Sequence, residues 1–313
     1  MLRLSTIADL ETLERPLHLA LGVFDGVHIG HQAVIGAAVA GAEESGGVAG
    51  VLTFEPHPIQ ILAPDRAPRR ILSSLEHKER LLEGLGVTVF LVLEFTSELA
   101  QQPAGEFAAG LVAAPTLRQL SAGEDWKFGR QRAGTVALLE SLGAREGVMV
   151  SAISSVMMDG ERVSSTRLRQ ALRDGNLKAA AAMLGRPYAV MGAVERGAQL
   201  GRALGFPTAN IAVGDEQLPP DGVYAVVVTA TGEDRPGIAN LGVRPTVSGE
   251  RRLLEVHLLN FEGDLYGVDV EVRFGRRLRG EKKYADVDAL KEQILCDVAA
   301  ARALFDEGEA MVC

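Results

Sequence analysis

The hydrophobic positions follow two different patterns, which change near residue 184. In the first part, short apolar runs alternate with helix-like stretches, which is typical of a parallel sheet covered by helices on both faces. The predicted strands cover 17–22, 47–54, 87–93, 117–122 and 147–152. The predicted helices cover 28–44, 74–85, 104–113, 134–142 and 165–173. Ligands of such sheets bind at the carboxyl ends of the strands.

The second part is rich in Val and Leu runs that Gly, Pro, Asn and Asp turns separate, at 223–229, 253–259 and 268–274. This pattern predicts antiparallel strands in a small barrel or sandwich. A helix over 286–304 should close the fold. Its expected apolar face consists of Val287, Leu290, Ile294, Leu295 and Val298. We therefore expect an α/β domain over 1–183 and an antiparallel β domain over 184–313.

The composition agrees with two globular domains and with a cytoplasmic protein. The chain has 313 residues, of which 47% are hydrophobic and 23% charged, so general disorder is excluded. Its two cysteines suit a reducing compartment, and we expect Cys296 to be a core thiol and Cys313 a free terminal one. The first residues carry acids where a signal peptide would be apolar. The longest apolar run, Val87–Leu93, is too short to span a membrane.

The net charge of −9 argues against a general nucleic-acid-binding protein. Any phosphate chemistry must therefore depend on local groups and on backbone dipoles. Both a monomer and a homo-oligomer are compatible with this composition.

The segment 22–32, Gly-Val-Phe-Asp-Gly-Val-His-Ile-Gly-His-Gln, follows the first strand and begins the first helix. Its glycines allow tight turns and a close approach of a ligand, and a helix N-terminus offers free N–H groups to an anion. His28 and His31 are three residues apart, so they project to the same side of the helix. This combination predicts a phosphate-binding cradle. The alternatives are two surface histidines, or a metal pair that lacks a third nearby ligand.

A second cluster, Ser164-Ser-Thr-Arg-Leu-Arg169, combines three hydroxyls with Arg167. Helix capping would explain one of the hydroxyls. The whole group favours phosphate contact, because arginine suits phosphate oxygens. We expect Arg169 to be on the surface.

Two further loops follow predicted strands. His57 lies in Thr53–Pro58, where the prolines favour extended backbone, and a rigid turn is an equal alternative to a binding role. In Gly123–Gly129, Asp125 could hold a ribose or an adenine amine. The aromatic rings Trp126 and Phe128 more often pack into a core than on a ligand.

The second part offers oxygen-bearing side chains on two strands. Thr208 and Asn210 are two residues apart, so an extended segment places them on one side. Neutral oxygens bind Mg²⁺ weakly unless a nucleotide completes the site, and spacing alone favours a simple turn at Pro207. Glu255 and His257 share one face of a strand. That face could be exposed to solvent, or Glu255 could act as a general base.

The first part resembles the adenylyltransferase module of the prokaryotic bifunctional riboflavin kinase/FMN adenylyltransferase family, within the nucleotidyltransferase superfamily. The motifs G-x-F-D-G-x-H-x-G-H, F-x-P-H-P, G-x-D-x-x-F-G and S-S-T-R carry the resemblance. It implies formation of FAD and pyrophosphate from FMN and ATP. It also assigns residues. The implied phosphate contacts are His28, His31, Ser164, Ser165, Thr166 and Arg167. The implied nucleotide contacts are Gly22, Phe24, Asp25, Gly26, Gly30 and Asp125, and His57 is implied at the flavin.

The second part resembles the riboflavin kinase module of the same family, a small barrel with a C-terminal helix. The motifs G-F-P-T-A-N, G-I-A-N-L-G-V-R-P-T, E-V-H, D-L-Y-G and L-R-G-E carry this resemblance. It implies that riboflavin and ATP give FMN and ADP. Thr208 and Asn210 match the motif that binds Mg²⁺ with ATP, and Glu255 matches the catalytic base. Gly201 is implied at the nucleotide, and Asn240 and Arg279 at the flavin.

The sequence departs from the family pattern at three places: Trp126 replaces Phe, Asn260 replaces a common Asp, and the loop 195–201 is less basic than usual. Three other functions are alternatives to this pair of activities. A class I aminoacyl-tRNA synthetase shares His-Ile-Gly-His, but no Lys-Met-Ser-Lys-Ser-like segment is present. An adenylyltransferase with a non-catalytic flavin-binding barrel and a flavin-sensing protein are both disfavoured by the intact motifs.

Overall fold

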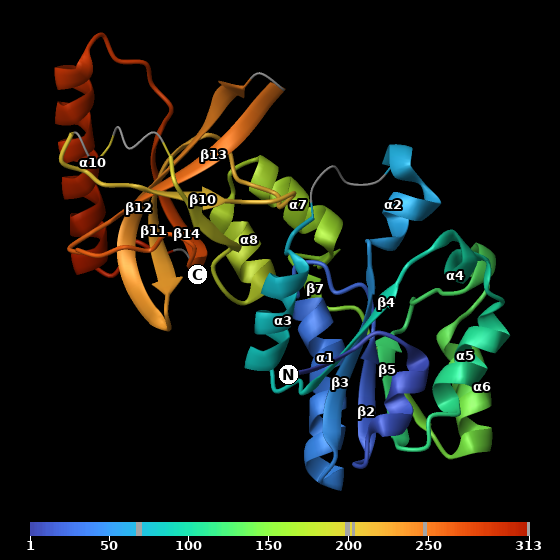
Figure 1. Cartoon of the computed structure of the whole chain (residues 1–313). Helices are drawn as coiled ribbons and strands as arrows, with labels where there is room; N and C mark the ends of the chain where they lie inside the picture. Colours follow the sequence, from blue (N-terminus) through green and yellow to red (C-terminus); the bar gives the residue numbers. More distant parts are fainter. Residues whose placement is uncertain (67–70, 198–200, 202–203, 247–248, 312–313) are drawn as a thin grey trace. The chain divides into compact units, whose positions relative to one another are not determined.

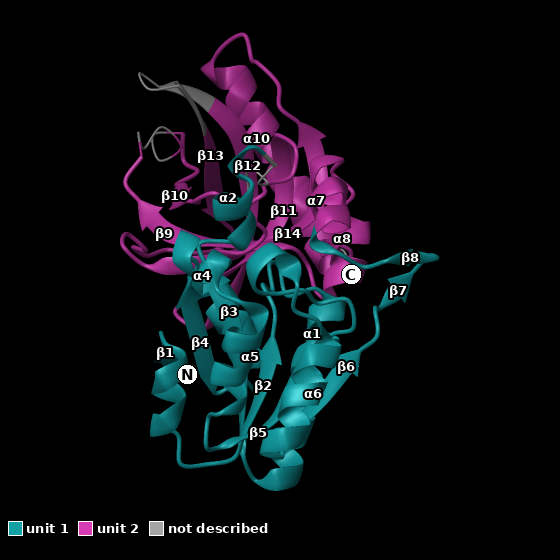
Figure 2. Ribbon diagram, turned by 90° about the vertical axis from the view of Figure 1, so that its right-hand side faces the viewer, with its two compact units in different colours: residues 1–69, 75–165 teal, residues 70–74, 166–313 magenta. Residues whose placement is uncertain are grey.

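The computed structural model describes the chain except for residues 67–70, 198–200, 202–203, 247–248 and 312–313 (Figure 1). The chain forms two compact units (Figure 2). The first unit comprises 1–69 and 75–165, and the second comprises 70–74 and 166–313. The compact units divide after Ser165, so residues 166–184 belong with the barrel. The expected boundary between 183 and 184 concerns which residues carry each activity, and it stays a prediction.

The first unit is built on a six-stranded sheet in which every pair of neighbours is parallel. The strand order is β1-β4-β3-β2-β5-β6. The strands are β1 (Leu2–Leu4), β2 (Leu17–Leu21), β3 (Val48–Glu55), β4 (Val89–Glu94), β5 (Leu117–Gly123) and β6 (Met149–Ile153). All five residues of β2 are buried, as expected for a central strand with both faces covered.

Helices cover both faces of this sheet because successive strand residues point to opposite sides. Leu19 of β2 belongs to one core with α5 (Ala104–Val112) and α6 (Val136–Glu146). Ala20 belongs to a second core with α1 (Ile29–Ser45) and α3 (Leu75–Gly84). The smaller elements are η1 (Ile7–Thr12), α2 (Pro58–Leu62), η2 (Pro64–Arg66), α4 (Ser97–Gln101), η3 (Arg130–Arg132), β7 (Met157–Met158) and β8 (Glu161–Arg162).

The second unit contains a closed antiparallel barrel, so the sandwich alternative is wrong. Around the barrel the strand order is β10-β13-β12-β11-β14-β9. The strands are β9 (Ala189–Glu195), β10 (Ala209–Ala212), β11 (Gly222–Ala230), β12 (Glu233–Thr246), β13 (Gly249–Leu258) and β14 (Asp269–Gly280). The helices are α7 (Ser165–Arg173), α8 (Leu177–Leu184) and α10 (Val287–Asp306). The predicted parallel sheet, barrel and terminal helix are therefore confirmed, whereas α8 was not predicted.

The short segment 70–74 belongs to the second unit although the residues on both sides of it belong to the first. Ile71 forms a parallel bridge with Glu216. Its N–H donates to the Asp215 carbonyl at 2.8 Å, and its carbonyl accepts from the Gln217 N–H at 2.7 Å. The Tyr188 hydroxyl donates to the Leu72 carbonyl at 3.3 Å. The chain therefore enters the second unit twice.

The buried face of α10 is the expected one in part, because Leu290, Ile294 and Val298 are half-buried. Val287 and Leu295 are 56% and 52% exposed, and Cys296 is exposed rather than a core thiol. Asp297 and Ala301 are buried instead. The reason is an ion pair that Asp297 forms with β14, which turns a polar position of the helix toward the barrel. The prediction for Cys313 lies outside the described residues.

Candidate functional site

The loop after β2 has an unusual backbone. Phe24 and Val27 have positive φ angles of 51° and 42°, and Gly26 has 85°. Such conformations are costly for residues with side chains and persist where the surroundings hold them. The Phe24 ring is buried in the core beneath the sheet's helices, 1% exposed. The loop is thus strained and anchored at a side chain.

Side chains from other elements hold alternate carbonyls of this loop. The Val23 carbonyl accepts from Thr53 Oγ1 at 2.9 Å, and the Asp25 carbonyl accepts from Ser165 Oγ at 3.0 Å. The Val27 carbonyl accepts from Gln32 Nε2 at 2.9 Å. The hydroxyl of Ser165 therefore connects the S-S-T-R motif to the glycine-rich loop, two segments that sequence reasoning placed at one site.

His28 and His31 stack on each other, with ring centroids 3.5 Å apart and planes 18° from parallel. His28 is the N-cap of α1, and its Nδ1 accepts from the His31 backbone N–H at 3.2 Å. The alternative of two surface histidines is wrong for His28, which is only 5% exposed. The stacked rings stand at the start of the helix, as the i, i+3 spacing predicts.

The pKa of His31 lies well below its usual range. Burial is the main cause, and the positive charges of His28, Lys78 and Arg162 add to it. Its buried Nδ1 has no hydrogen-bond partner among the described residues. His31 therefore favours its neutral form, and within the described part of the chain it has one buried polar atom without a hydrogen bond in the first turn of α1.

Two glycines allow the rings to pack closely. A Cβ on Gly30 would lie 3.2 Å from Nδ1 and Cε1 of His28. A Cβ on Gly22 would lie 2.8 Å from Cζ of Phe24, closer than real Cβ contacts. Gly22 and Gly30 thus allow the tight packing of the loop that the sequence predicts, and their contact with a nucleotide stays a prediction.

The motif Ser164–Arg169 contains one clear error of prediction. Arg169 is 7% exposed, not on the surface, because it lies on the buried side of α7 beside Leu168 and Leu172. Ser164 and Arg167 are half-buried and Thr166 is exposed. The roles of Ser164, Thr166 and Arg167 at a triphosphate stay predictions.

Asp125 is half-exposed and forms a two-pronged ion pair with Arg162 of β8. Arg162 Nη2 donates to Asp125 Oδ1 at 3.0 Å. The hydrogen bond from Arg162 lowers the pKa of Asp125 below its usual value. Sequence reasoning missed Arg162, although it stands two residues before Ser164. Its positive charge also faces His31, so it brings the Gly123–Gly129 loop and the histidines into one electrostatic neighbourhood.

The aromatic residues of that loop pack in the core, as predicted. Trp126 stacks on Phe128 with centroids 4.7 Å apart, and both contact the apolar cluster beneath the sheet. The His57 loop does not stay extended: Pro58 begins the short helix α2, and His57 Nδ1 caps it by accepting from the Ile59 N–H at 3.3 Å. A flavin-binding role for His57 stays a prediction.

In the second unit, strand register aligns three predicted residues. Asn210 of β10 pairs with Glu255 of β13, and Glu255 pairs with Asn240 of β12. Residues directly opposite each other project to the same face, with Cβ atoms about 5 Å apart. Their strand neighbours Leu254 and Val256 are buried and fill the barrel. The row Asn210–Glu255–Asn240 therefore lies on the outer face.

Two glycines before β10, Gly197 and Gly201, lie close to the predicted metal ligands. A Cβ on Gly197 would lie 2.3 Å from Asn210 Nδ2, and one on Gly201 would lie 3.2 Å from Thr208 Oγ1. His257 contacts the chain just before Thr208. Its Nδ1 contacts the Pro207 carbonyl at 2.9 Å and must carry the proton, because a carbonyl can only accept. His257 was missed as an anchor, although the strand alternation placed it beside Glu255.

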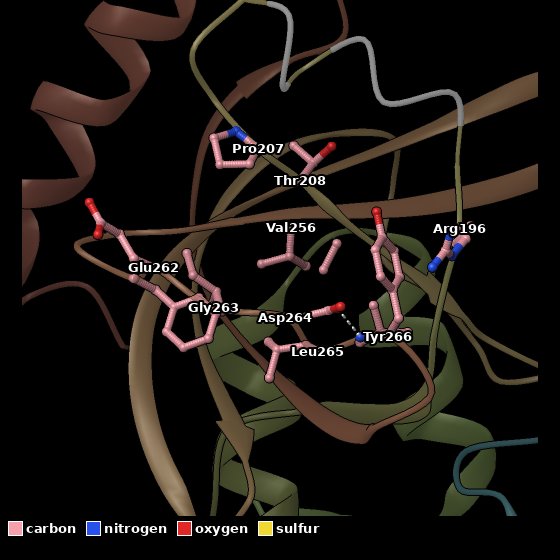
Figure 3. A pocket seen from close by; sticks show the side chains of 13 residues that line it. Arg196, Pro207, Thr208, Val256, Glu262, Gly263, Asp264, Leu265 and Tyr266 are labelled. Atoms are coloured by element: carbon pink, nitrogen blue, oxygen red, sulfur yellow. Dashed lines mark hydrogen bonds between the residues drawn. The ribbon is translucent and has the colours of Figure 1, made fainter.

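A pocket of about 610 Å³ opens next to Thr208 (Figure 3). Tyr266 and Arg196 border one end, where the guanidinium lies 5.0 Å from the ring centroid. The Tyr266 N–H donates to Asp264 Oδ1 at 2.9 Å, which shapes the D-L-Y-G turn. The lining residues are Val194, Arg196, Pro207, Thr208, Ala209, Val256, Leu258, Phe261, Glu262, Gly263, Asp264, Leu265 and Tyr266. The pocket is wide enough for a nucleotide-sized ligand.

Arg279 connects β14 to the terminal helix. Its Nε lies 2.9 Å from Asp297 Oδ1 and its Nη2 lies 2.8 Å from Oδ2. Gln293 Nε2 donates to the same carboxylate at 3.0 Å. Burial lowers the pKa of Arg279, but the hydrogen bond and charge of Asp297 outweigh it and raise the pKa overall. Arg279 therefore holds α10 against β14, and its predicted contact with a flavin stays a prediction.

Two family models match successive parts of the chain. A family model described as FAD synthetase matches residues 10–167, and one described as riboflavin kinase matches residues 184–305. A bifunctional riboflavin kinase/FMN adenylyltransferase of Pseudomonas fluorescens is 42% identical over 296 residues, which are 93% of this chain and 94% of that protein. The Escherichia coli protein of the same name is 41% identical over 293 residues, 92% of each chain.

Among solved structures, a Streptococcus pneumoniae protein named macrolide-efflux protein superposes with a TM-score of 0.83 and 32% identity. The match covers 96% of this chain and 98% of that one. Within the described residues, no helix is both long and apolar enough to cross a membrane.

Proposed function

Because the chain belongs to the family of bifunctional riboflavin kinase/FMN adenylyltransferases, we propose that each predicted domain carries one step of flavin cofactor synthesis. The enzyme phosphorylates riboflavin with ATP to give FMN and ADP, and it joins FMN to the AMP of a second ATP to give FAD and pyrophosphate. One observation carries this function: models of both activities match in succession, over 10–167 and 184–305. Residues 1–183 take the second step and 184–313 the first.

The adenylyl transfer needs positioning and charge neutralisation more than covalent help. An ionised FMN phosphate oxygen attacks the α-phosphorus of ATP, and pyrophosphate leaves. We assign the contacts with the ATP phosphates to the stacked His28 and His31 at the start of α1, with Arg167, Ser164 and Thr166 at the triphosphate. The geometry supports this because the rings, the helix N-terminus and the Ser165-held loop meet at the end of β2.

In the nucleotide subsite of this step, Phe24, Asp25 and Gly26 supply the loop, and Asp125 approaches the adenosine. The Arg162 ion pair supports that role by keeping Asp125 an acceptor-only carboxylate. His57 is assigned to the flavin. It lies at the carboxyl end of β3, the edge at which ligands of parallel sheets bind.

In the kinase step we assign the general base to Glu255. Its carboxylate would accept the proton of the ribityl hydroxyl as that oxygen attacks the γ-phosphorus. The aligned row with Asn210 and Asn240 supports this, since it places a base between a metal-binding amide and a flavin-binding amide. Arg279 is assigned to the flavin side beside α10.

Mg²⁺ fits the residues present. Thr208 and Asn210 supply neutral oxygens, the kind of ligand that Mg²⁺ takes, and the glycines at 197 and 201 let the backbone pass close to both side chains. Bound there with ATP in the adjoining pocket, the metal would neutralise charge on the phosphates. Gly201 is assigned to the nucleotide.

We place the enzyme in the cytoplasm, where its substrates ATP and riboflavin meet, and we assign it no nucleic-acid or membrane partner. The small-molecule partners are riboflavin, FMN, FAD, ATP, ADP and pyrophosphate.

The test is incubation with riboflavin, ATP and MgCl₂, followed by chromatography of the flavins. FMN and FAD should both form. FAD from supplied FMN alone would indicate a non-catalytic barrel, and no product from either would indicate a binding protein. His31→Ala should stop FAD formation from FMN and spare phosphorylation, while Glu255→Gln should do the reverse. If either change stopped both steps in a folded protein, the two sites would not be separate.

A further inference from the structure

Lys78 is a buried lysine in the first unit. It lies one turn into α3 and is only 4% exposed. Lysine side chains are almost never fully buried, because removing an ammonium from water is expensive. Helix packing alone therefore does not explain the burial of Lys78, which needs polar or charged partners.

The Lys78 ammonium donates to the Val23 carbonyl at 3.0 Å. That carbonyl also accepts from Thr53 Oγ1 at 2.9 Å, so two donors hold it. Val23 immediately precedes Phe24, which has a positive φ, and Val27 follows in the same loop with another. Strained backbone persists only when its surroundings over-determine it, and Lys78 supplies one of those constraints.

Two carboxylates lie near enough to the Lys78 ammonium to stabilise its charge. Burial lowers the pKa of Lys78, and the carboxylates of Asp25 and Glu55 oppose that shift. The charge of Lys78 in turn faces His31 from α3, while His28 faces it from the start of α1 and Arg162 faces it from β8. Lys78 thus acts on the histidine site both through the loop and through its charge.

We propose that Lys78 is a positioning residue of the adenylyltransferase site, where its buried ammonium holds the Val23 carbonyl and fixes the loop that leads into His28 and His31. The proposal rests on the assignment of those histidines to the adenylyl transfer. It predicts that the side chain is needed for the reaction and not for the fold.

The experiment compares Lys78→Met with Arg80→Met in the full-length enzyme. Methionine matches the length of lysine without its charge, and Arg80 is an exposed cation of the same helix. Three quantities are measured: FAD formation from FMN, the thermal unfolding midpoint followed by fluorescence, and the pKa of His31 followed by NMR. Trp126 is the chain's one tryptophan and lies in the first unit, so its fluorescence reports on that unit.

Lys78→Met should lower kcat for FAD formation by roughly tenfold or more, since small displacements at a reacting centre are costly. The first unit should remain folded at the assay temperature, although its unfolding midpoint falls because the buried Asp25 loses a charge partner. The pKa of His31 should rise, because one of the positive charges that depress it is gone. Arg80→Met should leave all three quantities unchanged.

Two results would overturn the proposal. In one, Lys78→Met keeps FAD formation within about twofold of the parent. In the other, the first unit of Lys78→Met is already unfolded at the assay temperature, which would make Lys78 a residue of the fold. The His31→Ala variant distinguishes a wrong assignment of the site from a wrong role of Lys78. An active His31→Ala enzyme removes the site assignment itself, whereas an inactive one beside an active Lys78→Met removes only the role of Lys78.

Discussion

Replacing Gly197 with alanine should selectively disable the riboflavin kinase step. The added Cβ would lie 2.3 Å from Nδ2 and 2.5 Å from Cγ of Asn210, whereas ordinary contact begins at 3.4 Å. The Asn210 amide must therefore move by about 1 Å or rotate away. An amide at the end of a short side chain can do so at little cost in stability, but it then leaves the row that it forms with Glu255.

The size of the effect follows from that displacement. A misplacement of about 1 Å at a reacting centre can cost about 100-fold in rate. This corresponds to about 2.7 kcal/mol of transition-state stabilisation. We expect Gly197→Ala to lower kcat/KM for riboflavin phosphorylation by this amount, with FAD formation from supplied FMN unchanged.

The assay follows both products by chromatography in one reaction series, first with riboflavin and then with FMN. Gly214→Ala is the matched control, because Gly214 lies in the same unit and a Cβ there meets nothing within 4 Å. Phosphorylation by Gly197→Ala at the level of Gly214→Ala would refute the reasoning. Equal loss of both steps would refute it too, since the substitution would then act on the whole protein.

Three other expectations concern the loop, the terminal helix and pH. Gly22→Ala, whose Cβ would meet the buried Phe24 ring, should reduce FAD formation by roughly tenfold while phosphorylation continues; undiminished FAD formation would show that the loop tolerates the shift. Asp297→Asn should destabilise the second unit by about 2–3 kcal/mol, because Arg279 loses its carboxylate, and circular dichroism during urea unfolding measures this while Trp126 fluorescence serves as the control. The folded-state pKa of His31 lies below its unfolded value of 6.5, so the unfolded chain binds its proton first and stability should fall as pH drops below 6.5. His31→Gln should flatten that decline in a Trp126 unfolding series, and an unchanged slope would assign it to other groups.

Local pattern was sufficient to predict the parallel sheet, the antiparallel strands of the second part and the projection of His28 and His31 to one side of a helix. Apolar runs define the buried strands, and the i, i+3 spacing on a helix places two side chains together without reference to the rest of the fold. The motif loops follow strands in sequence, so their position at the carboxyl edge also follows from the topology.

Contacts between distant segments were not predictable in this way. Arg162 lies on a strand of two residues, too short to show any periodicity, and its partner Asp125 is 37 residues away. Asp297 is a polar residue in a helical pattern, and its burial depends on Arg279, 18 residues earlier. Arg169 is buried for a similar reason: the packing of α7, not the residue's own polarity, decides where its side chain lies.

The double entry of the chain into the second unit limits how this enzyme can be divided. A fragment that starts at residue 184 would lack Ile71 and Leu72, which lie more than a hundred positions upstream in the chain. The Gln217 N–H, the Asp215 carbonyl and the Tyr188 hydroxyl would each lose a hydrogen-bond partner. A gene cut at the domain boundary would therefore produce a barrel fragment without the segment that bonds to Asp215, Gln217 and Tyr188. Recombination that exchanged the second unit for another would have to carry the segment 70–74 along.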